Sequence, residues 1–368
     1  MTAKLVLLGG FLGAGKTTTL INTARKLEQS GHVVGIVTND QGKELIDTEL
    51  AKSSGLEPKE ITGGCFCCKF DDLYANMNEL MEEKKPDFII AEAVGSCTDL
   101  IATVIQPLKQ YYSKEFKTAP LTIVVDPERL LGDLELSNDE TPNFSQSVDY
   151  IFEKQLAEAD IIAVNKSDIH SPEVIAKVKK YLQNRYPQTV IQEISASADH
   201  NLDELISIWK TSDVGGDKVL DIDYDIYAAG EAKLAWMNIL GDIHASTSID
   251  PYVWVQTFLD KLSAHIEREN MPIAHLKVHA GLENNGFVKA SLVKTGAAAT
   301  YTVENAQSAT FIRLVLNIRI ETEPDKLNLI VQDSIESTNE KVGTTWNGTY
   351  HECFSPLPPE PIHRLQKV

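Results

Sequence analysis

The sequence has no long hydrophobic run and comparatively little positive charge. None of its apolar stretches approaches the roughly 20 residues that a membrane span requires, and the start MTAKLVLLGG shows no signal-peptide cleavage pattern. The chain carries 34 Lys and Arg against 53 Asp and Glu, a formal net charge of −19. Binding to a nucleic-acid backbone needs clustered cations instead. We therefore expect a cytoplasmic protein with neither a membrane nor a nucleic acid as its partner.

Cysteine is scarce, yet three of the five cysteines crowd into Cys65, Cys67 and Cys68. Such crowding favours metal or redox chemistry over a disulfide framework, and soft thiolates suit Zn²⁺ and Cu⁺. Because two of the three are adjacent, one segment is not expected to close a tetrahedral site with all of them. A fourth ligand would come from elsewhere or from solvent. A redox dithiol and small packed side chains are the alternatives. No histidine-rich run accompanies the cluster.

The segment GFLGAGKT, residues 10–17, has the form G-x-x-x-x-G-K-T between a predicted strand at 5–8 and a predicted helix. Glycines let backbone N–H groups turn toward phosphate oxygens, and the helix directs its positive end at the same place. Lys16 should reach the β/γ-phosphates as a catalytic cation, and Thr17 should ligate Mg²⁺. The expected nucleotide contacts in this loop are Gly10, Gly13, Ala14, Gly15, Lys16, Thr17 and Thr18.

A second motif, Asn165-Lys166-Ser167-Asp168, follows a predicted strand at 161–164 and resembles the guanine-reading motif of GTPases. The Asp168 carboxylate would accept from the N1–H and N2–H₂ of guanine, a donor pair that adenine lacks. We expect Asn165, Lys166 and Asp168 to bind the base. Ser195 and Ala196 would support the guanine O6, although a turn serine is an equally simple interpretation of Ser195.

Acidic residues end two further predicted strands. Glu92 opens E-A-V-G, where its carboxylate would hold Mg²⁺ at the catalytic centre and the Gly95 N–H would meet the γ-phosphate. Asp40 ends the strand at 32–40 and would serve Mg²⁺, a second metal or neither. Cys97 lies just beyond Glu92. It either joins Cys67 and its neighbours in a nucleotide-sensitive thiolate site or packs behind the loop.

The order of these elements predicts the architecture. Alternating strands and helices favour an α/β fold, a P-loop NTPase with a mostly parallel sheet and helices on both faces, over residues 1–212. Strands bunched between two helices predict a smaller α+β domain at 226–342, after an acidic linker. The proline-rich residues 343–368 should form an extended tail. We expect the remaining candidate ligands to be ordinary side chains, namely His275, His279, His351 and Cys353.

Four motifs in order, GGFLGAGKTT, GGCFCC, EAVG and NKSD, resemble the CobW-type (cobalamin-synthesis-protein-like) GTPase family, a relative of the nickel-handling HypB and UreG GTPases. The resemblance covers residues 1 to about 210. It implies GTP hydrolysis coupled to delivery of Zn²⁺ or Co²⁺, bound by the cysteines, to a client metalloprotein, for example a corrinoid-dependent one. The alternatives are a nucleotide-gated activation protein without metal transfer and a small-molecule kinase.

Two departures from the family pattern leave the metal and the client open. Where the family shows N-E-x-G-E, this chain has Asn39-Asp40-Gln41-Gly42-Lys43, and a protonated lysine cannot bind a metal. Cys97, after E-x-x-G, is an addition to the common pattern. The sequence does not determine the oligomeric state, and a homodimer is one option.

Overall fold

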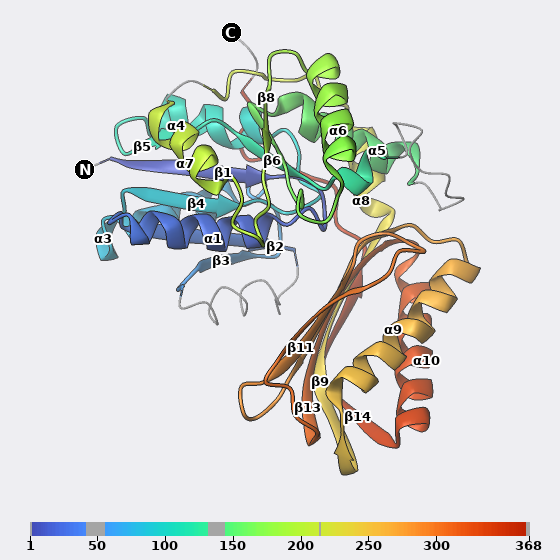
Figure 1. Ribbon diagram of the computed structural model, residues 1–368. Helices are drawn as coiled ribbons and strands as arrows, with labels where there is room; N and C mark the ends of the chain where they lie inside the picture. Colours follow the sequence, from blue (N-terminus) through green and yellow to red (C-terminus); the bar gives the residue numbers. More distant parts are fainter. Residues whose placement is uncertain (1, 42–55, 132–143, 213–214, 366–368) are drawn as a thin grey trace.

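The computed structural model describes residues 2–41, 56–131, 144–212 and 215–365, which form two units around two sheets (Figure 1). The first sheet has eight strands in the order β3-β2-β4-β1-β6-β7-β8, with β5 paired to β1. All its pairings are parallel. The second sheet has six antiparallel strands in the order β12-β11-β10-β13-β9-β14. Among the described residues, no helix combines the length and apolar character needed to cross a membrane.

Helices cover both faces of the first sheet because its central strands are buried on both sides. Along β1, Leu5 and Leu7 pack in one hydrophobic cluster, whereas Val6 and Leu8 pack in another. The strands are β1 (Ala3–Gly9), β2 (Val34–Asp40), β3 (Lys59–Thr62), β4 (Phe88–Glu92), β5 (Phe116–Thr118), β6 (Thr122–Val125), β7 (Ile161–Val164) and β8 (Val190–Glu193). The helices are α1 (Lys16–Gln29), α3 (Phe70–Glu83), α4 (Gln106–Tyr111), α5 (Gln146–Glu158), α6 (Pro172–Arg185), α7 (Leu202–Thr211) and α8 (Tyr224–Ala232). This alternation is the predicted α/β fold.

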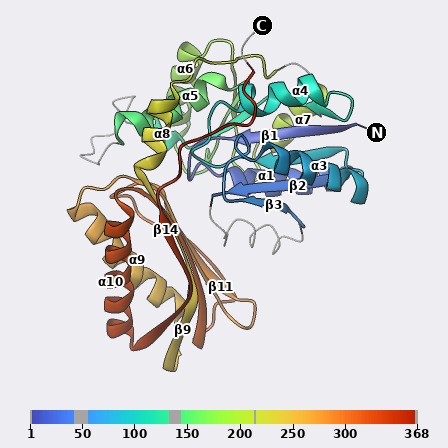
Figure 2. The same ribbon diagram turned by 180° about the vertical axis from the view of Figure 1, so that it is seen from behind.

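The second unit buries one face of its sheet under two helices, α9 (Pro251–Arg268) and α10 (Pro324–Val342). Leu276 and Val278 on the sheet share a cluster with Phe258 and Val331 on the helices. Its strands are β9 (Leu234–Ile249), β10 (Ile273–Gly281), β11 (Phe287–Leu292), β12 (Thr300–Glu304), β13 (Ala309–Glu321) and β14 (Thr344–Phe354). Figures 1 and 2 show both helices on the same side of this sheet.

The expectation of an extended tail from residue 343 is wrong for its first part. Gly343 ends α10 with a φ of 79°, and β14 then runs antiparallel to β9. Proline, which cannot donate to a sheet ladder, enters only at Pro356, whereas the preceding Thr, Trp and Tyr favour strands. Helix α8, with Asp223 as its N-cap, begins two residues before residue 226, where we expected the second domain to start.

The two units meet at the short helix Pro127–Arg129, which follows β6. Arg129, in the short helix Pro127–Arg129, donates to the backbone oxygens of Ile273 (3.3 Å), Ala274 and Val293 (3.0 Å). Beside it, the Lys294 ammonium lies 3.0 Å from the Glu128 carboxylate. Because one side chain bonds three carbonyl groups of the other unit, Arg129 should fix how the second sheet sits on the first.

Replacing Arg129 with Met should leave those three oxygens without their donor and lower the free energy of unfolding by about 2 kcal/mol. Urea unfolding followed by circular dichroism measures the change. The matched control is Arg185→Met, which removes an exposed ion pair with Glu153 on the surface. It should change stability by less than about 0.5 kcal/mol. Equal effects of the two substitutions would contradict the role given to Arg129.

Candidate nucleotide and metal site

The loop between β1 and α1 has the backbone of a phosphate-binding cradle. Gly10, Gly13 and Gly15 take φ values of 125°, 79° and 94°, and a Cβ on Gly10 would collide with the Val124 backbone oxygen. The Lys16 ammonium folds back onto the loop, 2.9 Å from the Gly10 oxygen and 3.3 Å from the Phe11 oxygen. Ala14 is buried, and Thr18 lies half-exposed in the first turn of α1. The loop therefore presents its N–H groups and the lysine to one cradle.

The end of β4 lies directly beside this loop. Parallel pairing of β1 with β4 sets Leu8 opposite Glu92, and the Thr17 hydroxyl donates to the Glu92 Oε1 over 2.9 Å. Both side chains are buried. A hydroxyl and a carboxylate in contact are the oxygen donors that Mg²⁺ takes at a nucleotide site, so these two residues fit that ion. Gly95 follows, and a Cβ there would lie 2.6 Å from the Leu12 Cδ2.

The guanine-motif residues converge on the same edge of the sheet. Asn165 donates to the Ala14 oxygen (2.9 Å) and accepts from the Ala196 N–H (2.9 Å), so it joins the phosphate loop to the loop after β8. The Asp168 carboxylate is exposed and accepts from the Ser195 hydroxyl over 2.6 Å. Lys166, with a φ of 58°, forms an ion pair with Asp126 at 2.6 Å. Asp126 was absent from the sequence expectations.

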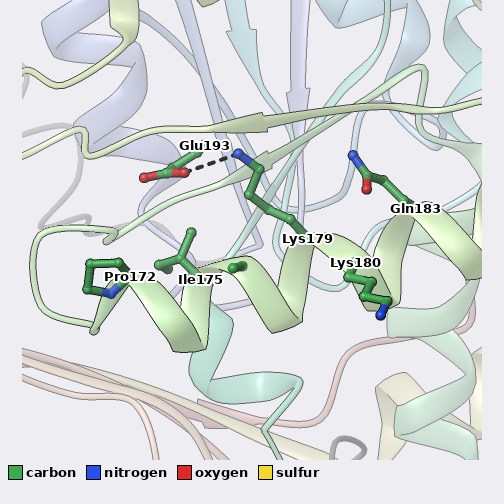
Figure 3. Close-up of a pocket in the computed structure, with 7 residues that line it drawn as sticks. Pro172, Ile175, Lys179, Lys180, Gln183 and Glu193 are labelled. Atoms are coloured by element: carbon green, nitrogen blue, oxygen red, sulfur yellow. Dashed lines mark hydrogen bonds and ion pairs between the residues drawn. The ribbon is translucent and has the colours of Figure 1, made fainter.

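A separate hollow between α6 and β8 contains none of the predicted site residues. Pro172, Ile175, Lys179, Lys180, Gln183 and Glu193 line it, and Figure 3 shows the Lys179 ammonium directed at Glu193, 3.1 Å away. The ion pair satisfies both charges. This hollow therefore adds no group to the nucleotide site.

The three crowded cysteines form one cluster of sulfur atoms at the start of α3. The Sγ separations are 2.8 Å for Cys65–Cys67, 3.5 Å for Cys65–Cys68 and 3.7 Å for Cys67–Cys68. Because Cys67 and Cys68 are adjacent, we expected that the three thiols would not face one site. Instead, a tight turn, in which the Cys68 N–H donates to the Cys65 oxygen, brings all three to one side. Within the described parts of the chain, this is the one group of three potential metal ligands.

The geometry of the cluster suits a thiolate-bound metal. Tetrahedral Zn–S bonds of 2.3 Å place sulfurs about 3.8 Å apart, close to two of the three separations. Without a metal, hydrogen bonding to Cys65 raises the pKa of the Cys67 thiol well above its usual range. A bound cation would instead lower the pKa of this thiol, since coordination to a metal deprotonates it. Three sulfurs leave one tetrahedral position to another ligand.

Cys97 lies next to this cluster. Its side chain is fully buried, and its Sγ is 4.0 Å from the Cys67 Sγ. Hydrogen bonding from Cys65 and Cys67 lowers the pKa of Cys97 to about 6. The structure thus brings Cys97 to the cluster. Asp40 ends β2, but its side chain and Lys43 lie outside the described part of the chain.

The other candidate ligands do not gather. His275 and His279 lie on β10, and His351 and Cys353 on β14. His351 contacts the Asn328 Oδ1 at 2.8 Å, and the Cys353 thiol contacts the Pro324 oxygen at 3.2 Å.

Asn39 and Glu231, neither of them predicted as a site residue, each hold one of the two loops that carry the cysteines. Asn39 donates to the Ile61 oxygen (3.0 Å) and the Gly64 oxygen (2.7 Å), tying the Gly-Gly turn to β2. Glu231 of α8, buried, accepts from Ser96 (2.6 Å), just before Cys97. Burial raises the pKa of Glu231 well above its usual range. Asn39 belongs to the segment compared above with the family's N-E-x-G-E pattern, whereas no sequence pattern around Glu231 indicates a role for it.

The end of the described chain runs across the cysteine cluster. The Glu360 N–H donates to the Cys68 Sγ over 3.2 Å, and the Ile362 N–H to the Cys67 oxygen over 3.0 Å. Arg364 then forms an ion pair with the buried Asp99 at 2.7 Å. We call residues 359–365 the terminal strap. It covers the half-buried member of the cluster.

Comparison with known proteins gives a family match over the first unit. The model described as "CobW/HypB/UreG, nucleotide-binding domain" matches residues 4–192. The zinc chaperone YeiR of Escherichia coli K12 is 30% identical over 180 residues, which cover 48% of this chain and 50% of YeiR. The zinc chaperone CobW of a Sinorhizobium species is 29% identical over 199 residues, 48% of this chain and 54% of CobW.

A Dictyostelium discoideum protein named zinc-regulated GTPase metalloprotein activator 1 is 25% identical over 214 residues, 49% of this chain and 43% of that protein. The chain thus spans about half the length of the curated relatives it matches. Among solved structures, HypB from Helicobacter pylori in complex with nickel aligns at a TM-score of 0.41 and 17% identity, over 58% of this chain and 87% of HypB.

Deleting residues 359–368 should make Cys68 react severalfold faster with iodoacetamide, because the Glu360 N–H no longer shields its sulfur. Mass spectrometry of each cysteine against time measures the rates. Cys353 precedes the deletion and serves as the internal control, with an unchanged rate. If Cys68 reacts at the same rate in the full chain and the shortened one, the strap does not cover it.

Proposed function

Because the chain belongs to the CobW/HypB/UreG family of nucleotide-binding domains, we propose that it is a GTP-hydrolysing metallochaperone whose nucleotide state controls a metal at the cysteine cluster. One observation carries this proposal. The loop after β4 touches both sites, since Gly95 packs against Leu12 of the phosphate loop and Cys97 lies 4.0 Å from Cys67. A displacement of that loop by the nucleotide would move a thiol at the metal site.

GTP would bind along the edge formed by the phosphate loop and the loops after β7 and β8. Lys16 would stabilise charge on the β/γ-phosphates, and Thr17 and Glu92 would hold Mg²⁺. When bound, that ion neutralises charge on the phosphates during hydrolysis. Asp168 would exchange its serine hydroxyl for the guanine N–H donors, which supports guanine over adenine as the base.

The metal would be Zn²⁺, or Co²⁺ with similar ligands, held by Cys65, Cys67 and Cys68. The names of the curated relatives, which are zinc chaperones and a metalloprotein activator, support zinc and a client protein. A client metalloprotein would receive the ion when the nucleotide changes. The second unit, joined to the first through Arg129, would contact the client.

Asp168→Asn should lower GTP affinity by roughly 10- to 100-fold, because the amide cannot accept from both guanine donors. The variant should gain affinity for xanthosine triphosphate, whose 2-oxo group accepts from the new amide. Competition binding with a fluorescent nucleotide measures both effects. Asp203→Asn, the same change at an exposed carboxylate paired with Lys26, is the control. Equal affinity of the wild type for ATP and GTP would contradict guanine recognition.

The number of cysteines on the metal can be read from Co²⁺ spectra. Cys67→Ser should weaken the thiolate-to-metal charge-transfer band, and Cys353→Ser, a control on β14, should leave it intact. Cys97→Ser should weaken it in one nucleotide state, with a GTP analogue or with GDP. If Cys97→Ser leaves both the band and the Co²⁺ affinity unchanged in both states, Cys97 is not a ligand.

A further inference from the structure

His275, on β10 of the second unit, is buried, with only 7% of the residue exposed. Within the part of the chain that the structure describes, neither Nδ1 nor Nε2 of its ring has a hydrogen-bond partner. Buried polar groups in native proteins are normally paired, and an unpaired one is costly. An apolar side chain of similar size would avoid that cost. We therefore expect the ring to form a hydrogen bond with a bound ligand.

The backbone directly before His275 lies against the phosphate loop. A Cβ on Gly13 would lie 3.3 Å from the Ala274 oxygen and 2.9 Å from the Val293 Cγ1. Arg129 holds the same stretch through the Ile273 and Ala274 oxygens. Asn165, expected to bind the base, contacts the loop at Ala14, and Gly95, expected to meet the γ-phosphate, contacts it at Leu12. Gly13, the glycine that β10 touches, lies between them.

The protonation state of the ring follows from burial and from positive charge in its neighbourhood. Burial, together with the charges of Lys277, Arg319, Lys16 and Arg129, lowers the pKa of His275 well below its usual range. The imidazole is therefore neutral and has one N–H to donate. One of these cations, Lys16, is the lysine of the phosphate loop, which reaches the β- and γ-phosphates of a nucleotide. A neutral donor among cations suits a phosphate oxygen.

We propose that His275 donates a hydrogen bond to the terminal phosphate of the nucleotide, so that the second unit distinguishes a triphosphate from a diphosphate. This inference rests on the proposed binding of GTP to the phosphate loop. It assigns His275 a positioning role. The ring, which belongs to the second unit, binds the γ-phosphate, so that the presence of this phosphate affects how the second sheet packs on the first unit. Hydrolysis would remove the ring's acceptor.

His275→Leu tests the proposal, because leucine fills a similar volume without polar atoms. The affinity for GTPγS should fall about tenfold, the loss expected for one hydrogen bond to a charged group, while the affinity for GDP stays the same. The melting temperature of the nucleotide-free variant should equal or exceed that of the wild type, because no unpaired nitrogen remains buried. His279→Leu, on the same strand, is the matched control and should leave the ratio of the two affinities unchanged.

The ¹⁵N signals of the His275 ring supply a readout independent of any variant's folding. They should shift when GTPγS binds to the wild type and stay in place with GDP. An unchanged GTPγS-to-GDP ratio in His275→Leu would overturn the proposal. So would an equal loss of both affinities with a lower melting temperature, the outcome of a packing role. A wild type that binds no guanine nucleotide would overturn the proposed function itself.

Discussion

The pairing of β1 with β4 determines how the candidate nucleotide site and the candidate metal site are related. Its register sets Leu8 opposite Glu92, so both strands deliver their loops to the same edge of the sheet, as parallel strands do. From there the phosphate loop and the E-A-V-G loop run in contact, with Gly95 against Leu12. Because Cys97 follows directly on this loop, a short stretch of backbone connects the phosphate loop to the thiols. A slip in register would separate Thr17 from Glu92 and Cys97 from Cys67 together.

Contacts from outside the first sheet hold this arrangement in place. Glu231, on the helix that leads into β9, accepts from Ser96 inside the protein. Arg129 donates to the Ile273 oxygen of the second sheet, and the backbone of β10 packs against Gly13. The phosphate loop therefore contacts the second unit, and the E-A-V-G loop contacts the helix that precedes that unit. Under the proposed function, such contacts offer a path by which the client surface and the nucleotide influence each other.

Local patterns predicted the parts of the site that lie close together in the sequence. Glycines at fixed spacing before Lys16 and Thr17 indicate the phosphate loop, and the spacing of Asn165 and Asp168 after a predicted strand indicates the second motif. What could not be predicted depends on long-range pairing. Nothing near Glu231 indicates that it meets Ser96, which is 135 residues away in sequence. The terminal strap reaches Cys68 only because β14 first joins the second sheet. The close approach of Cys67 and Cys68 depends on turn geometry that their adjacency alone does not specify.

The most direct test of the account is the Zn²⁺ affinity of the wild-type protein in its two nucleotide states. Competition against a chromogenic chelator, with Mg²⁺ and either GTPγS or GDP at saturation, measures both dissociation constants on one preparation. If the E-A-V-G loop couples the two sites, the constants should differ by roughly fivefold or more, the lower range of allosteric coupling. Equal Zn²⁺ affinities in the two states would contradict the claim that the nucleotide controls the metal.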